Sequence, residues 1–157
     1  MKAVLRRIAV SGCVLFGFVH SAGAQAPHGM TLDELAGALS AANMLTQRSG
    51  EFLVGQVNGM PFDISGYNCQ GDRCTEFLIV AGFDLKEPFP MARINDWNEK
   101  EIAGRAYLDA EGDPYVDHLF SVSGPNDGAV VREVVLLWEA IIDNFSDYID
   151  LPVVGSV

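Results

Sequence analysis

The chain is poor in the residue types that most often carry chemistry, with three cysteines and three histidines among 157 residues. After residue 24 the histidines are His28 and His118, which are too few soft ligands for a zinc module. No G-x-S-x-G elbow, H-E-x-x-H helix or phosphate-binding glycine loop occurs in the sequence. We therefore expect no cofactor, and the lack of a recognisable catalytic constellation favours a non-enzymatic protein.

Basic residues are scarce as well. Three of the ten Lys and Arg precede residue 8, so residues 25–157 hold seven of them against all 21 Asp and Glu, a formal charge of −14. Such a surface repels phosphate backbones, which excludes nucleic-acid binding. Acidity is chiefly a means of solubility, although it also favours cationic partners.

A hydrophobic run long enough to span a membrane is lacking too. The apolar segment 8–19 is shorter than the roughly 20 residues that a bilayer requires. It follows a basic start and precedes Ala22-Gly23-Ala24, the small-x-small pattern of a signal peptidase site. The sequence predicts a signal peptide over 1–24, cleaved after Ala24, and a periplasmic or secreted protein with no membrane span.

Two other export signals are less consistent with the leader. Cys13 ends a lipoprotein-like box, but only residues 8–10 would remain as uninterrupted apolar chain before that box. Arg6-Arg7 resembles part of a twin-arginine signal, but the usual residues after the pair are missing. We therefore favour an ordinary cleaved signal over a lipid anchor at Cys13.

Export would leave Cys69 and Cys74 in an oxidising compartment, where an even number of cysteines favours a disulfide. The four residues between them have a turn composition, so the cysteines can face each other across a hairpin. The C-x4-C spacing is not that of a redox C-x-x-C motif. The alternative is a free or redox-sensing pair of thiols.

About 133 residues after the leader fit a single domain, with an ordered core over about 31–150. A capping box at Thr31 and Glu34 predicts a helix to about residue 43. Asn58-Gly59 predicts a hairpin of strands 51–57 and 60–67, in which Leu53, Gly55 and Val57 face Ile64, Phe62 and Met60. Pro61 implies an unpaired side or an irregularity in the second of these strands.

The rest of the chain continues this pattern. The apolar run 75–83 is typical of a strand that is buried on both faces or central in a sheet. A short helix begins at Pro90, strands follow over 102–108 and 115–122, and a long helix covers about 128–149. The predicted fold is α+β in the order α-β-β-β-α-β-β-α, with a mainly antiparallel sheet packed by helices.

Three segments resemble the YbjN-type domain, a bacterial family labelled a sensory transduction regulator. They are Ile94 to Asn98, Arg105 to Asp109 and Gly112 to Pro114, supported by Cys69, Gly71 and Cys74 before an apolar strand. The resemblance covers most of residues 25–157 and implies a fold similar to that of type III secretion chaperones. Residues 99–104 lack an expected aromatic, and the leader differs from cytoplasmic members, so a cytoplasmic regulatory role does not carry over.

The acidic group Asp109, Glu111, Asp113 and Asp117 has alternating carboxylates, an arrangement that calcium loops use. The full loop length and the distal bidentate Glu are missing, so a solvated hairpin turn is the better interpretation. His118 is a candidate general base, because pairing across the last hairpin can bring it near Arg105. No activated nucleophile accompanies it, which favours a structural histidine.

Two segments are candidates for partner binding. Trp97, flanked by Asn95 and Asn98 and joined by Arg105, can recognise a peptide or a sugar or can pack the short helix onto the sheet, and we favour packing. The last helix has an apolar stripe that includes Trp138 and is wider than one sheet contact needs, with Leu136 near its polar side. The extra apolar width of this stripe is compatible with a contact to a second subunit or a client polypeptide, or with a helix buried deeply in the core of its own domain.

These observations predict an exported, non-enzymatic module that binds another polypeptide, as a chaperone-like or regulatory protein. The alternative is a calcium-dependent binder, or a small periplasmic enzyme that uses His118 or the acids from Asp109 to Asp117. A homodimer is compatible with the wide helix stripe.

Overall fold

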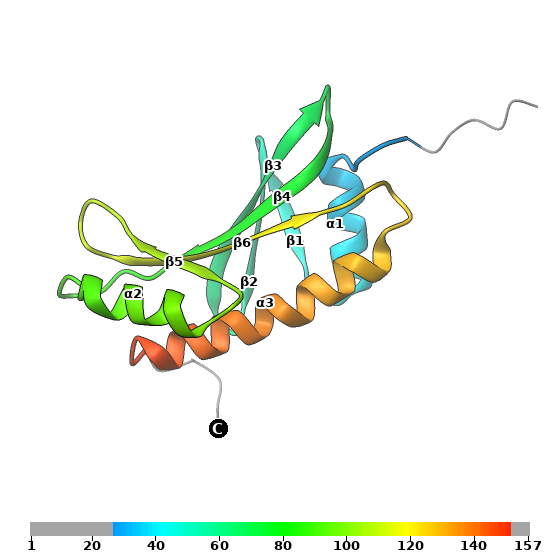
Figure 1. The fold of residues 1–157 in the computed structure, drawn as a ribbon. Helices are drawn as coiled ribbons and strands as arrows, with labels where there is room; N and C mark the ends of the chain where they lie inside the picture. The colour runs from blue at the N-terminus through cyan, green and yellow to red at the C-terminus, as the bar shows by residue number, and fades with distance from the viewer. Residues whose placement is uncertain (1–26, 152–157) are drawn as a thin grey trace, which may run out of the picture.

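A computed structural model describes residues 27–151 as three helices and six strands (Figure 1). The leader 1–24, with Cys13 and the cleavage site, and the tail 152–157 lie outside the described residues. In chain order the elements are α1 (Leu32–Ala41), β1 (Thr46–Ser49), β2 (Phe52–Val57), β3 (Met60–Gln70), β4 (Arg73–Gly82), α2 (Met91–Lys100), β5 (Arg105–Leu108), β6 (Pro114–Ser121) and α3 (Gly128–Tyr148).

The strands form one antiparallel sheet in the order β1-β2-β3-β4-β6-β5. The predicted α+β class and the predicted order of helices and strands are confirmed. The structure adds one short strand, β1, at the edge beside β2. Its sequence Thr-Gln-Arg-Ser has no apolar alternation, because an edge strand on this sheet contributes little to the core.

The first hairpin has the predicted turn and register. Asn58 and Gly59 both have positive φ, 50° and 82°, as a two-residue type I′ turn requires. Leu53 pairs with Ile64, Gly55 with Phe62 and Val57 with Met60. The pairing of β3 with β4 begins at Asp63. Pro61 precedes that residue, so the amide proton that proline lacks leaves no gap in the ladder between β3 and β4.

β4 has the predicted central position, between β3 and β6, but only one of its faces is fully buried. Phe77, Ile79 and Ala81 are at most 2% exposed, whereas Leu78 and Val80 on the other face are only half-buried. The continuous apolar run therefore does not mean burial on both sides. It makes an apolar stripe on a face that the helices leave accessible.

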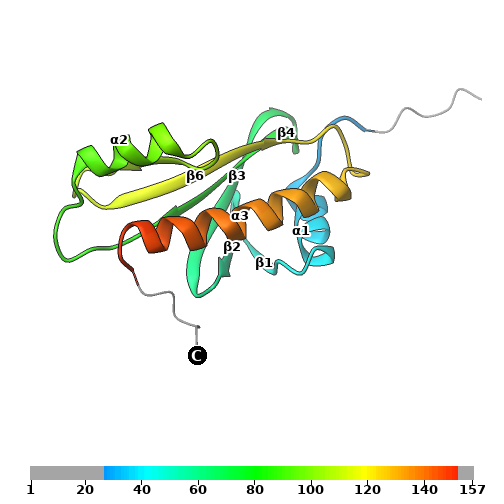
Figure 2. The same ribbon diagram turned by 60° about the horizontal axis from the view of Figure 1, so that its bottom comes forward.

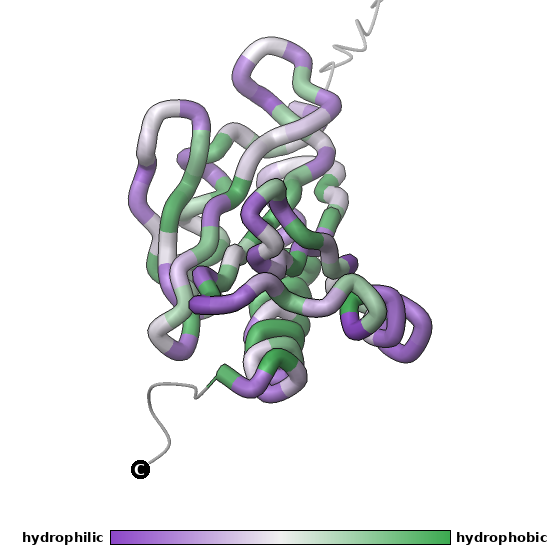
Figure 3. The backbone as a smooth tube through the Cα atoms, turned by 90° about the vertical axis from the view of Figure 1, so that its left-hand side faces the viewer, coloured by the Kyte–Doolittle hydropathy of each residue, from purple (hydrophilic) through white to green (hydrophobic). Residues whose placement is uncertain are grey.

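The hydrophobic core lies between one face of the sheet and helices α1 and α3 (Figures 1 and 2). Trp138 of α3 is fully buried and meets Phe62 of β3 edge to face, while Phe145 meets Phe83. Figure 3, which views α3 nearly end on, shows hydrophobic and hydrophilic residues alternating along its turns. No helix in the range 27–151 is long and apolar enough to cross a membrane.

Helix α1 begins at the predicted capping box. The Thr31 hydroxyl accepts a hydrogen bond from the Glu34 amide at 3.1 Å, and the Glu34 carboxylate accepts one from the Thr31 amide at 2.9 Å. These reciprocal bonds satisfy two amides that the first helical turn cannot pair. They also place the Glu34 carboxylate where it can meet the β3–β4 hairpin.

Candidate functional site

The second face of the sheet carries a set of exposed apolar side chains. Strand alternation places Phe52, Val54, Tyr67 and Leu119 on this face, because their chain neighbours Leu53 and Phe120 point into the core. These four side chains are 38–52% exposed. Leu78 and Val80 lie between them on β4, half-buried. We call this set the open face; among residues 27–151 no helix packs on it.

A cleft of about 560 Å³ lies at one margin of the open face. It forms because β5, whose first residue is Arg105, pairs with β6 no further than Asp117, while β6 continues to Ser121. Side chains of β3, β4 and β6 meet the loop that precedes β5 there, and the lining residues are Tyr67, Glu76, Leu78, Ile102, Ala103, Gly104, Arg105, Asp117, His118 and Leu119. Ile102 is fully exposed at the rim, so the cleft is bordered by apolar surface.

The outer edge of β6 is unpaired along this cleft. β6 turns its even-numbered backbone groups toward β4, since Pro114 accepts from Phe83 and the Val122 amide donates to Thr75. The odd-numbered groups therefore face the other way, where β5 covers only residues up to Asp117. By this alternation the backbone N–H and C=O groups of Leu119 and Ser121 point away from β4, and in the described part of the chain no strand, turn or loop pairs with them there.

Arg105 and Asp117 form the main ion pair of the cleft. The Asp117 side chain is 5% exposed and accepts hydrogen bonds from Nε and Nη2 of Arg105, the first at 3.1 Å. The hydrogen bond and the charge of this carboxylate raise the pKa of the Arg105 guanidinium, which is 70% exposed and stacks near Tyr107. Two bonds from one guanidinium leave Asp117 a poor base or metal ligand.

His118 lies at the same cleft but on the opposite side of β6 from Asp117. Partial burial lowers the pKa of its imidazole, and the negative charge of Asp117 opposes this effect only in part. The neutral form is therefore favoured near pH 7. The structure does bring His118, Arg105 and a carboxylate to one cleft, as an enzyme would require, but no Ser, Thr or Cys side chain lines it.

The acids proposed for calcium are used by the fold. Asp109 accepts from the amides of Glu111 and Asp113 at 2.9 Å, and Asp113 accepts from the Leu85 amide at 3.0 Å. Asp117 points to Arg105 instead. Over residues 27–151, no three His, Cys, Asp or Glu side chains converge as metal ligands. The group therefore has the geometry of a hydrogen-bonded hairpin turn.

The segment around Trp97 forms a scaffold. Trp97 is 3% exposed, packs against Phe145 and Tyr148 of α3, and donates from Nε1 to the Gly104 carbonyl at 2.6 Å. Asn98 donates to the Ala106 carbonyl at 2.9 Å and accepts from its amide at 2.8 Å. Asn95 is exposed. Trp97 is therefore not available as a surface contact, and Asn98 closes the outer edge of β5.

The two candidates for partner binding on the last helix, Trp138 and Leu136, lie in different environments. Trp138 is fully buried, so it belongs to the core and not to a binding surface. Leu136 is 62% exposed, and Val130 and Leu137 are exposed to 39% and 37%. Most of the wide stripe is buried, because both the sheet and α1 cover α3.

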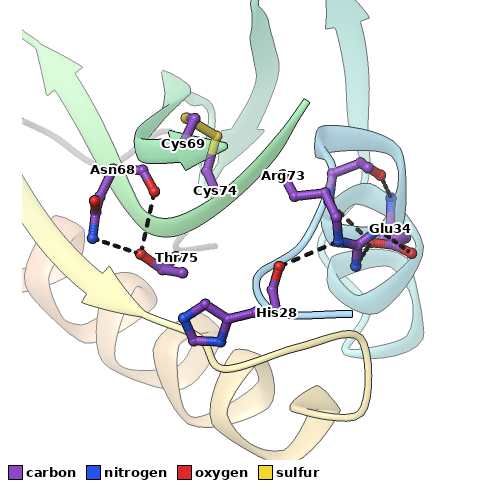
Figure 4. Close-up of a disulfide and its surroundings, with 8 residues drawn as sticks. His28, Glu34, Asn68, Cys69, Arg73, Cys74 and Thr75 are labelled. Carbon is purple, nitrogen blue, oxygen red and sulfur yellow. Dashed lines mark hydrogen bonds and ion pairs between the residues drawn. A yellow bond between two sulfur atoms is a disulfide. The ribbon is translucent and has the colours of Figure 1, made fainter. Parts of the chain in front are cut away.

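Cys69 and Cys74 are joined by a disulfide near the tip of the β3–β4 hairpin (Figure 4). They pair across the strands on either side of a two-residue turn at Gly71-Asp72, which is shorter than the four-residue loop that we expected. Arg73 ties the tip to the N-terminal part of the fold, through the Gly29 carbonyl at 2.7 Å and Glu34 at 2.8 Å.

Sequence reasoning missed most of the cleft and the open face. The sequence predicts strands at Phe52, Tyr67 and Leu119 but no exposed binding surface there, and it predicts that a strand begins at Ile102, which lies in the loop before β5. Period-two alternation can mark Phe52 and Leu119 as opposite to core positions. It cannot show which face the helices cover, nor that β5 stops at Arg105.

Residues 31–151 match the YbjN family, described as "Putative bacterial sensory transduction regulator". Among solved structures, the chain is similar to YbjN from E. coli, described as "a putative transcription regulator", with 17% identity and a TM-score of 0.54. This likeness covers 76% of our chain and 89% of the other, and it shows a shared fold. No match was found among curated proteins. Because the family match spans most of the chain, this protein belongs to the YbjN family.

Proposed function

We propose that this protein is an exported, non-enzymatic module that binds another polypeptide noncovalently, in a chaperone-like or regulatory role. The open face is the observation that carries the proposal. It presents two apolar groups on one sheet surface, Phe52 and Val54 on β2, and Leu78, Val80 and Leu119 on β4 and β6, with Tyr67 on β3 near its end. Ser65 and Asp63 of β3 lie between the two groups. Apolar side chains exposed together on one surface are typical of interaction sites in soluble proteins.

Two further features support this proposal. The family is described as a regulator and not as an enzyme. The leader 1–24 and the paired cysteines agree with an oxidising compartment, so we place the protein in the periplasm or outside the cell.

Capture experiments with the mature chain, residues 25–157, test polypeptide binding. The variant Phe52→Lys with Leu119→Lys places two charges on the open face without touching the buried core. We expect polypeptides retained from periplasmic extract by the wild-type protein to be lost. The matched variant Met91→Lys changes an exposed apolar residue of α2, away from the open face, and should retain them. Equal retention by all three proteins would argue against the open face as the binding surface.

The enzymatic alternative has one observation in its favour, the meeting of His118, Arg105 and Asp117 at the cleft. Asp117 is already bound by Arg105, and no hydroxyl or thiol nucleophile lines the cleft, so we favour binding. Hydrolysis of a panel of chromogenic ester, phosphate and glycoside substrates separates the two proposals. Turnover that disappears in His118→Gln while the fold is retained would establish the enzyme.

A further inference from the structure

We propose that the unpaired edge of β6 accepts an extended polypeptide segment as an additional strand, and that the segment carries basic residues among apolar ones. This inference rests on the proposed polypeptide binding and defines its mode. Main-chain hydrogen bonds to Leu119 and Ser121 would supply affinity, and alternate side chains would contact the cleft.

The gap at this edge has defined ends. At one end of the gap, Arg105, the first residue of β5, pairs with Asp117 of β6. The residue before it, Gly104, lies outside the sheet and has a φ of +79°. On the other side, the Ser123 amide is bound by Asp127 and its carbonyl accepts from Gly29 at 2.8 Å. Between these ends, Leu119 and Ser121 each present one N–H and one C=O. An added strand therefore continues the line of β5 and satisfies four backbone groups.

The neighbouring edge shows the contrast. Asn98 pairs with both backbone groups of Ala106, so at this residue the outer side of β5 is already occupied by a side chain. An unpaired strand edge is a template for another chain, and proteins commonly cover it or shield it with charge. Along β6 the exposed residues at the gap are Leu119 and Ser121, neither of which is charged. This edge is therefore left open to pairing.

The side-chain environment indicates the chemistry of the segment. A residue of the added strand that points toward the open face would meet Leu119 and the apolar part of the cleft. Glu76 lines the cleft without an ion-pair partner among the described residues, while Arg105 is neutralised by Asp117. The surrounding domain holds seven Lys and Arg against 21 Asp and Glu. Lysine or arginine between apolar residues therefore matches the site.

The same charge opposes a second copy of this chain as the occupant. Edge-to-edge pairing of two β6 strands would bring two domains of formal charge −14 together. A basic segment of another protein is attracted by that field. We therefore assign the edge to a heterologous partner.

A synthetic peptide tests the inference directly. The probe is an N-acetylated, C-amidated octapeptide of alternating lysine and valine, added to the ¹⁵N-labelled mature chain. We expect saturable binding, with at least tenfold slower hydrogen exchange at the amides of Leu119 and Ser121. The same peptide N-methylated at every residue keeps its charge but cannot pair as a strand, and it should not bind. A glutamate–valine octapeptide should bind at least tenfold more weakly than the lysine–valine probe.

Ser121→Pro removes an outward amide without removing a hydrogen bond of the native sheet, and Ser121→Ala is its matched control. We expect at least tenfold weaker probe binding for the proline variant and unchanged binding for the alanine variant. Absence of probe binding, or binding without protection of Leu119 and Ser121, would overturn strand addition, as would equal binding of the N-methylated peptide. Open-face-dependent capture would still support polypeptide binding in those cases. Probe-induced loss of a dimer would instead assign the edge to a second copy.

Discussion

Asn98 of α2 and Ala106 of β5 exchange two hydrogen bonds, the side-chain amide donating to the Ala106 carbonyl and its oxygen accepting from the Ala106 amide, at 2.9 and 2.8 Å. The asparagine thus replaces a neighbouring strand at the outer edge of β5. The β6 gap has no such side-chain cover among the described residues, because β5 pairs with β6 only as far as Asp117.

Asn98→Ala should destabilise the fold. Ala106 is 4% exposed, so its amide and carbonyl would lose their partners with little access to water. We expect a loss of about 1–3 kcal/mol in the free energy of unfolding, measured by urea denaturation. Asn95→Ala, at an exposed position of the same helix, should change it by less than about 0.5 kcal/mol. Equal effects of the two changes would contradict the role of Asn98.

Replacing Cys69 and Cys74 together by alanine should lower stability by about 2 kcal/mol, since a short closed loop restricts the unfolded chain. The wild-type mature protein should lose a similar amount on addition of dithiothreitol, while the double variant should not respond. Thiol titration of protein isolated from the periplasm checks the bond itself. Two free thiols there would contradict an exported, oxidised state.

Glu34 should make stability depend on pH below neutrality. Its hydrogen bond from the Thr31 amide and, next, that from Arg73 lower the pKa of its carboxyl below the ordinary value. The stabilisation is therefore complete above that ordinary pKa and is lost as pH falls through the lower, folded-state pKa. Glu34→Gln should lose less stability than wild type between pH 6 and pH 3. Glu133→Gln, an exposed control on α3, should follow the wild-type curve.

His118 should also make stability fall on acidification, but at higher pH than Glu34. Its folded-state pKa is lowered by burial, so below the ordinary histidine pKa of about 6.5 the unfolded chain takes up the proton first. Stability should decline as pH falls from 7 to 5, and His118→Gln should show a smaller decline over this window. An NMR titration of the imidazole gives the pKa independently. A midpoint above 6.5 would contradict the burial argument.

Leu136 offers a test of the last helix as a partner surface. Because its side chain is 62% exposed, Leu136→Ser should change the free energy of unfolding by less than about 0.5 kcal/mol. Trp138→Ala removes a fully buried ring and should cost about 3–5 kcal/mol. If the mature protein is a dimer through α3, Leu136→Ser should shift its sedimentation toward the monomer.

Local patterns predicted much of the fold. The Thr31–Glu34 box, the Asn58-Gly59 turn and the pairing of Leu53 with Ile64 depend on residues close in sequence, so their chemistry is visible in the chain. β1 was missed because its polar residues have no core-facing alternation. The apolar run of β4 does not show whether both faces of the strand are buried, because Leu78 and Val80 are equally compatible with a half-accessible face and with a buried one.

The candidate site was harder to predict. Trp97 and Trp138 were plausible surface residues until packing with α3 and β3 buried them. The open face depends on which side of the sheet α1 and α3 cover, and the cleft depends on β5 ending before β6. Both are relations between segments far apart in the chain.

The sequence by itself determined the acidic charge, the hairpin register, the helix cap and the family, because each depends on composition or on neighbouring residues. The tertiary structure decided that Trp97 and Asn98 belong to the scaffold, that the loop before β5 lines the cleft, and that Phe52, Leu119 and Ser121 remain accessible. The physical reason is that burial and edge pairing are set by the packing of distant elements. The same leucine or serine can be covered in one arrangement and exposed in another.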